Sequence, residues 1–196
     1  DASTDEADVE LATALNLDRE VAFRSSLLNA RLVRYRIPDN RSIEAALAAI
    51  ATRAGVISAS PEYVYRPIQG AGRSALGPQY AIDRLRVAEA HRIALGRNVR
   101  IAVVDTGIDD SHPEIKGAVA DSFDAIGMGR PKPESHGTSI AGILVARGQM
   151  KGIAPEARVV SVRAFSTDGG ARTPEATTLS LVKGLEWAFI GGTRLY

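Results

Sequence analysis

Two short apolar runs, residues 99–104 and 159–165, interrupt the mixed pattern in the second half of the chain. Each is long enough for one strand and is dominated by Val, Ile and Ala, which is typical of parallel strands that are buried on both faces. Residues 136–146 and 174–190 carry apolar side chains at helical spacing. Strands that alternate with helices predict a parallel sheet with helices on its faces, so we expect an α/β fold here.

The first 68 residues show weaker and mixed patterns that predict a small α+β domain. In residues 31–37 apolar and basic side chains alternate, as in a half-buried strand. Ser42 is a favourable N-cap for the apolar helical pattern that ends near Gly55. The same reasoning predicts helices over residues 9–15 and 21–28 and strand pieces over 56–60 and 63–66.

Glycine, serine and proline concentrate between these two regions. Residues 69–78 have the composition of a linker. We therefore divide the chain into a domain at 1–68, a linker at 69–78 and a second domain at 79–196. In the second domain we predict a helix at 87–94 and an irregular segment at 115–130.

Composition excludes several classes of function. The net charge of +1 indicates neither nucleic acid nor a membrane surface as a general partner. The chain has no cysteine, which rules out disulfides, thiolate metal sites and a cysteine nucleophile. No apolar run approaches the roughly 20 residues of a membrane span. The first residue is Asp and no signal peptide is visible, which we interpret as processing or truncation.

Asp105 and His136 are the candidate catalytic residues. Asp105 ends the first apolar strand, where α/β sheets place their ligand crevice, and His136 opens the next apolar helix. A carboxylate and an imidazole brought together are two-thirds of an Asp-His-Ser triad. The alternatives are a strand-ending Asp and a helix-opening His without chemistry, or a phosphoaspartate enzyme. The last lacks its second Asp, because Gly107 stands there.

A metal site is a weaker alternative for the same region. Asp109, His112 and Glu114 follow Asp105 closely and could form a cluster of ligands. We instead interpret His112 with Pro113 as shaping a turn and the two acidic residues as solvent-facing, so no metal or other cofactor is expected. His91 is interpreted as a packed structural histidine.

Four segments in the same order resemble the subtilisin-like serine proteases, the S8 or subtilase family. They read VVDTGID with SHPEI, HGTSIAGILVA, KGIAPEARVVSVRAF and GLEWAF, and together span about residues 79–189. Residues 31–68 more loosely resemble the inhibitory propeptide of such enzymes. The resemblance implies an incomplete subtilisin-like three-layer αβα parallel sheet, the N-terminal half of the catalytic domain, preceded by a small α+β propeptide-like domain.

The family's chemistry implies roles for individual residues. His136 would be the general base, Asp105 would orient it, and Gly169 and Gly170 would lie beside an extended peptide substrate. Some family members bind calcium through the loop after the histidine helix, but here residues 147–152 are short and contain no Asn or Asp. The implied partners are a peptide or protein substrate and an intramolecular propeptide, and the implied location is secreted or otherwise extracytoplasmic.

The nucleophilic serine and the oxyanion asparagine of the family have no counterpart in this sequence. Ser139 lies three residues after His136 on the same predicted helix, where it cannot meet both the imidazole and a substrate carbonyl. We therefore expect a fragment that is inactive alone, from a serine endopeptidase whose Ser lies beyond the chain. The alternative is an inactive fragment whose propeptide-like region binds and inhibits or chaperones a protease.

Overall fold

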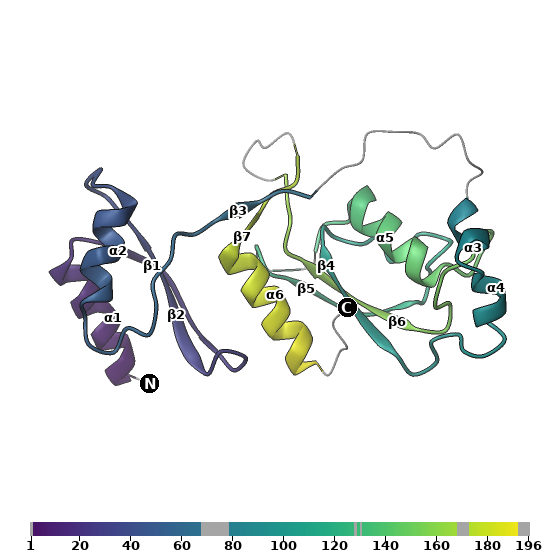
Figure 1. Cartoon of the computed structure of the whole chain (residues 1–196), viewed down its shortest axis with the longest axis horizontal. Coiled ribbons are helices and arrows are strands. Elements are labelled where there is room, and N and C mark those ends of the chain that lie inside the picture. The colour runs from purple at the N-terminus through teal and green to yellow at the C-terminus, as the bar shows by residue number, and fades with distance from the viewer. Residues whose placement is uncertain (1, 68–78, 128, 130, 168–172, 192–196) are drawn as a thin grey trace. The chain divides into compact units, whose positions relative to one another are not determined.

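The computed structural model describes residues 2–67, 79–127, 129, 131–167 and 173–191. By their contacts they separate into two compact units, residues 1–63 and 64–196, and each is described by itself (Figure 1). The predicted linker at 69–78 lies outside the described residues.

The first unit joins two helices to a two-stranded antiparallel sheet. Its elements are α1 (Ala2–Ala14), β1 (Asp18–Ser25), β2 (Ala30–Arg36) and α2 (Ile43–Ala51). The hydroxyl of Ser42 accepts the backbone N–H of Ala45 at 3.2 Å, which confirms the predicted cap of α2. The strand expected at 31–37 is also confirmed, as β2.

Residues 21–28 form part of a β-hairpin, so the helix predicted there is wrong. β1 pairs with β2, and the connecting turn is fixed by the buried Ser25, whose hydroxyl accepts the N–H of Leu28 at 3.1 Å. Asn29 has the left-handed φ of 46° that such turns require. Pairing with a neighbouring strand thus overrides the weak helical spacing. The strand predicted at 56–60 is likewise absent from the described structure.

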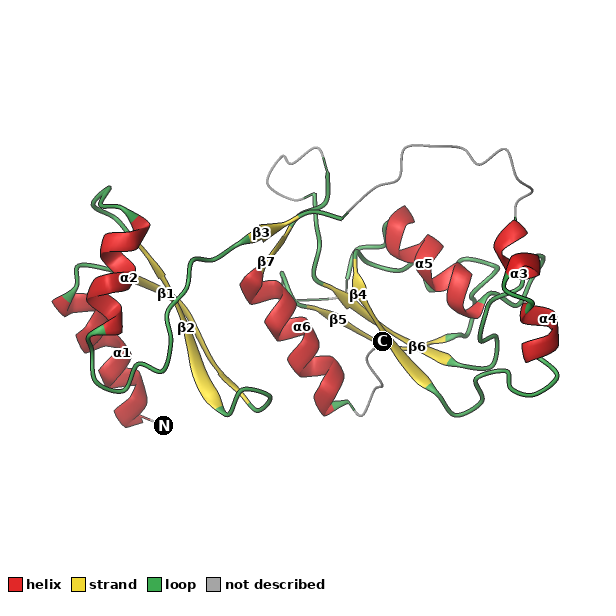
Figure 2. Cartoon of the chain, viewed as in Figure 1, coloured by secondary structure: helices red, strands yellow, loops and turns green. Residues whose placement is uncertain are grey.

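The second unit is built on a parallel sheet of three strands in the order β4-β6-β5 (Figure 2). The strands are β4 (Arg100–Asp105), β5 (Val119–Asp124) and β6 (Arg158–Arg163). The remaining elements are β3 (Val64–Tyr65), α3 (Tyr80–Arg84), α4 (Val87–Ala90), α5 (Ser135–Val145), β7 (Ala176–Thr177) and α6 (Thr178–Ile190). The two apolar runs of the sequence are the paired strands β4 and β6, which confirms the predicted parallel sheet.

Helices cover both faces of this sheet and form a three-layer αβα arrangement (Figure 1). On one face, Val103 packs with Ala141 and Val145 of α5. On the other, Val162 packs with Ala188 of α6, and the ring of Phe123 stacks on Trp187 at a centroid distance of 5.1 Å. The sheet is thereby packed between α5 and α6.

Two predictions for the second unit are corrected. Residues 119–124, expected to be irregular, form the edge strand β5, whose exposed Asp121 and Ser122 give no apolar run. The last helix begins at Thr178 and is capped by Thr177, instead of beginning after Thr173. Ser166 and Glu175 form an antiparallel bridge that holds the chain extended up to this point, which explains the later start.

Candidate active site

Asp105 lies at the carboxyl end of β4, the first of the two apolar strands. Its carboxylate oxygen Oδ1 accepts the backbone N–H of the next residue, Thr106, at 2.6 Å. Its carbonyl oxygen accepts the N–H groups of Ala164 and Phe165 at 2.8 and 3.1 Å. Both the main chain and the carboxylate are therefore fixed at the sheet edge where α/β proteins bind ligands.

His136 lies in the first turn of α5, which approaches the end of β4 closely. The hydroxyl of Thr106 accepts the N–H of Gly137 at 2.9 Å. A Cβ at position 137 would lie only 2.5 Å from the carbonyl oxygen of Thr106, so only glycine permits this approach. The contact places the residue before Gly137, the candidate histidine, next to Asp105.

The two candidate residues are in direct contact. Nδ1 of His136 lies 2.6 Å from Oδ1 of Asp105, and the side chains are 31% and 17% exposed. With Nδ1 protonated toward the carboxylate, Nε2 is the ring nitrogen left to take up and release protons. Part of each side chain is accessible, so this pair can act as a general base on a bound molecule.

Arg163 forms a buried ion pair beside this site. It is paired with Asp105 on one side of β6 and with Asp124 on the other in the strand register. Its guanidinium contacts the Asp124 carboxylate at 3.1 Å and donates to the hydroxyl of Ser166 at 2.7 Å. These contacts link the ends of β5 and β6 to Ser166, in the segment that follows β6.

Comparison with known proteins matches part of the second unit to one enzyme family. Residues 96–189 match the model of the Subtilase family of peptidases, and they contain both Asp105 and His136. This region belongs to the subtilase family. The predicted resemblance to subtilisin-like proteases is thereby confirmed for the second unit.

Curated subtilases align over about half of this chain. Mycosin-1 of Mycobacterium tuberculosis (strain ATCC 25618 / H37Rv) is 36% identical over 106 residues, which are 50% of this chain and 24% of the relative. Thermitase of Thermoactinomyces vulgaris is 28% identical, over 60% of this chain and 42% of the relative. Subtilisin E of Bacillus subtilis (strain 168) is 30% identical, over 56% and 29%. The chain thus spans less than half the length of these relatives.

One solved structure that is similar to part of this chain is MycP1 with its N-terminal propeptide removed. It is 29% identical, with a TM-score of 0.49 over 59% of this chain and 36% of that one. The maturation protease PagA is 25% identical, with a TM-score of 0.44 over 55% of this chain and 36% of that one.

The structure also describes two other residues that the sequence analysis considered in the subtilase region, Ser139 and His91. Ser139 donates from its hydroxyl to the carbonyl of Ser135 at 2.8 Å, along the axis of α5. Gly169 and Gly170 lie outside the described residues. His91 contacts the carbonyl of Ile153 through Nε2 at 2.9 Å.

The acidic residues after β4 are held separately by local groups. Asp109 accepts from the N–H and hydroxyl of Ser111 at 3.0 and 2.6 Å. His112 accepts the N–H of Glu114 through Nδ1 at 3.3 Å. Over the part of the chain that the structure describes, no three His, Asp or Glu side chains gather as metal ligands would.

Glu114 fixes the loop that follows α5. Its carboxylate accepts three successive backbone N–H groups, those of Gly148, Gln149 and Met150, at 3.2, 2.9 and 2.9 Å. These bonds, led by that of Met150, hold the pKa of Glu114 below its usual 4.5, against the opposing effect of desolvation. In the subtilase region the conformation of this loop is therefore held by hydrogen bonds from its own backbone N–H groups to the Glu114 carboxylate.

We predict that Glu114→Gln makes the chain less stable in a pH-dependent manner. Since the folded pKa is lowered, the carboxylate stabilises the fold fully above about pH 4.5, and this stabilisation is lost as the pH falls through the folded pKa. Urea unfolding at several pH values should show the largest difference from wild type at neutral pH and a narrowing difference below pH 4.5. A difference that is the same at pH 3 and pH 7 would contradict this role of the charge.

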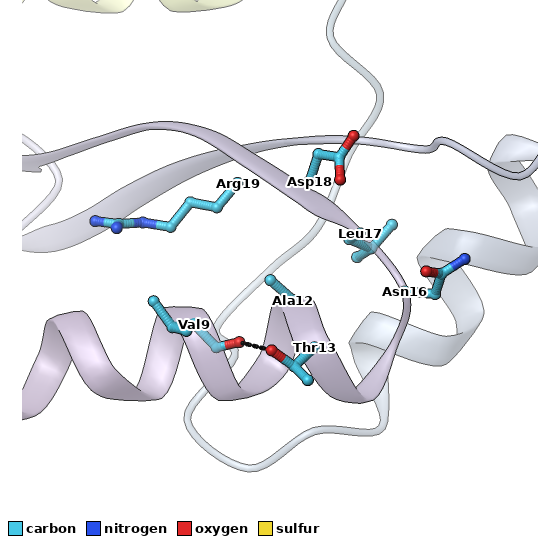
Figure 3. Close-up of a pocket in the computed structure, with 7 residues that line it drawn as sticks. All are labelled: Val9, Ala12, Thr13, Asn16, Leu17, Asp18 and Arg19. Carbon is cyan, nitrogen blue, oxygen red and sulfur yellow. Dashed lines mark hydrogen bonds between the residues drawn. The ribbon is translucent and has the colours of Figure 1, made fainter.

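A cavity of about 430 Å³ lies in the first unit, between α1 and β1 (Figure 3). Its lining includes Val9, Ala12 and Leu17, and Thr13 donates from its hydroxyl to the carbonyl of Val9 at 2.9 Å. Its only charged residues are Asp18 and Arg19. It contains none of the candidate residues, which belong to the other unit.

Sequence reasoning missed two charged residues that the structure places at, or just beyond, the carboxyl end of β6. Arg163 lies inside an apolar run, and the apolar pattern by itself predicts only a buried strand there. Glu175 lies within the helical pattern of residues 174–190, yet it bridges to Ser166 just beyond the end of β6. A charged residue within an otherwise apolar strand is the signal that could have identified Arg163, because such a charge requires a buried partner.

Proposed function

We propose that this chain contributes the Asp105 and His136 of a subtilisin-type serine endopeptidase. The observation that carries the proposal is the 2.6 Å contact between His136 Nδ1 and Asp105 Oδ1 at the carboxyl edge of the sheet. Membership of residues 96–189 in the subtilase family supports it. The substrate class is peptide or protein, and the nucleophilic serine is supplied by a segment outside this sequence.

In this mechanism His136 moves one proton twice in each half-reaction. Nε2 takes the proton of the serine hydroxyl as its oxygen attacks the peptide carbonyl, and then gives that proton to the leaving amine when the C–N bond breaks. In the second half-reaction a water molecule attacks the acyl carbonyl. Nε2 takes a proton from this water and gives it to the serine oxygen as the acyl C–O bond breaks. Asp105 keeps Nδ1 protonated and stabilises the imidazolium formed in between.

Covalent labelling tests the proposal directly. A polypeptide that carries this chain through the segment with the serine is incubated with a fluorophosphonate, which bonds to activated serine hydroxyls. Labelling is expected, and its rate should fall strongly in His136→Ala. If no label is incorporated while the protein is folded, hydrolase function is rejected.

We also propose that residues 1–68 form a propeptide-like domain that contacts the catalytic part of the same molecule. Pairing of β3 with β7 supports this, because residues 64–65 add a strand to a segment beyond β6. Added in excess, a polypeptide of residues 1–68, which keeps β2 paired with β1, should slow a related subtilase. An unchanged rate at high peptide concentration would exclude this role.

The proposed location is secreted or otherwise extracytoplasmic. One relative is named as the minor extracellular protease Vpr of Bacillus subtilis (strain 168), 30% identical over 50% of this chain and 13% of its own length. Among the helices the structure describes, none has the length and apolar character needed to cross a bilayer.

A further inference from the structure

The strand β7 already binds an extended segment of its own chain. β3 lies antiparallel beside it, with Val64 opposite Thr177 and Tyr65 opposite Ala176 (Figure 1). The side chains of Val64 and Tyr65 are 55% and 41% exposed, so their burial contributes little to the pairing. Backbone pairing of this kind accepts many sequences, and selectivity must come from individual side chains.

One side-chain contact distinguishes this pairing. Arg66 follows β3 and Glu175 precedes β7, so the antiparallel register places them opposite each other. The guanidinium Nε and Nη2 of Arg66 lie 2.7 and 2.5 Å from Glu175 Oε1. Two donors on one carboxylate oxygen favour the planar guanidinium over an ammonium group.

The position of Glu175 is fixed by the segment that leaves the catalytic sheet edge. Its backbone N–H and carbonyl both bond to Ser166, at 2.8 and 3.0 Å. Phe165, one residue before, donates its N–H to the carbonyl of Asp105 at 3.1 Å. The residue before β7 is therefore bridged to Ser166, the residue that follows the bond from Phe165 to Asp105.

We propose that Glu175 selects a basic side chain, arginine above lysine, in a peptide bound along β7, and that Val64–Arg66 occupies this position as an intramolecular ligand. The proposal rests on the proposed function, since it assigns to the endopeptidase a preference for substrates with arginine opposite Glu175. Arg66 is 65% exposed and Glu175 31%, so the preference is moderate in size.

Peptide binding to the full chain tests this selection. The variant Val64→Pro/Tyr65→Pro/Arg66→Ala removes the N–H donors and the charge of the chain's own strand, which frees β7. A fluorescent peptide with the sequence of residues 62–67 is compared by anisotropy with versions that carry alanine or glutamate in place of the arginine. The arginine peptide should bind about fivefold more tightly than the alanine peptide, as expected for an exposed ion pair.

Substitutions of Glu175 show whether this carboxylate is responsible. In Glu175→Gln the preference should disappear, and in Glu175→Arg the glutamate peptide should become the preferred one. Glu156→Gln is the matched control, because Glu156 forms a similar ion pair with Arg97 before the other end of β6 and should leave the preference unchanged. Circular dichroism confirms that each variant is folded.

Each outcome decides the proposal. Equal binding of the three peptides, or a preference that survives Glu175→Gln, would overturn selection by Glu175. Absence of binding by any peptide to the folded variant would overturn β7 as a peptide-binding edge. Fluorophosphonate labelling of the longer polypeptide that includes the serine segment reports on hydrolysis separately. If the chain binds the arginine peptide selectively but the longer, folded polypeptide is not labelled, the proposed function is rejected and the peptide site is retained.

Discussion

Asp105→Asn is expected to lower kcat/KM by a factor on the order of 10⁴ in a polypeptide that includes the nucleophilic serine. The asparagine amide retains the shape of the carboxylate but not its charge, and its NH₂ group cannot accept the Nδ1 proton of His136. The imidazole is then free to adopt the wrong tautomer, and the imidazolium formed during reaction loses its counter-charge. Steady-state hydrolysis of a chromogenic peptide measures this loss.

The control for this prediction is Asp109→Asn. Asp109 follows four residues later and bonds to Ser111, so the same change of charge occurs nearby without touching His136. Its kcat/KM should stay close to that of the wild type. An Asp105→Asn variant that retains more than about a tenth of wild-type kcat/KM would contradict the role assigned to Asp105, because triad carboxylates contribute far more.

The second large effect concerns stability. Asp124→Ala is expected to lower the free energy of unfolding by about 3–5 kcal/mol, because it removes the carboxylate partner of a buried guanidinium. The side chains of Arg163 and Asp124 are only 3% and 8% exposed. Asp124 also accepts the N–H groups of Ile126 and Gly127, both at 3.0 Å, so the turn after β5 loses its cap at the same time.

Urea denaturation of three variants separates these contributions. Asp124→Asn keeps an oxygen acceptor for the turn and should cost less than Asp124→Ala. Glu156→Ala breaks the exposed ion pair with Arg97 and should cost less than about 1 kcal/mol. A cost of Asp124→Ala no larger than that of Glu156→Ala would show that the buried pair does not stabilise the sheet edge.

The parallel sheet could be predicted because β4 and β6 are covered on both faces. Burial on both sides requires nearly continuous apolar runs, and such runs are visible in a single sequence. β5 could not be predicted in the same way. It is an edge strand with exposed Asp121 and Ser122, and it is held by pairing with β6, which local sequence does not encode.

The contact between Asp105 and His136 could also be predicted, since one residue ends a strand and the other begins the next helix. Contacts between segments that are far apart in the sequence could not be predicted. Arg66 and Glu175 are 109 residues apart in the sequence. Thr173 and Pro174 have the local signature of a helix start, but the bridge between Ser166 and Glu175 and the cap at Thr177 shift the helix to Thr178.

The most direct test of the account is a kinetic cycle on Asp105 and His136. The rates of fluorophosphonate labelling are compared for Asp105→Ala, His136→Ala and the double variant. If the carboxylate acts only through the imidazole, the double variant should react within about threefold of His136→Ala, because residues that act as a unit are not additive. Losses that multiply in the double variant would mean that the two residues act independently and would contradict the proposed relay.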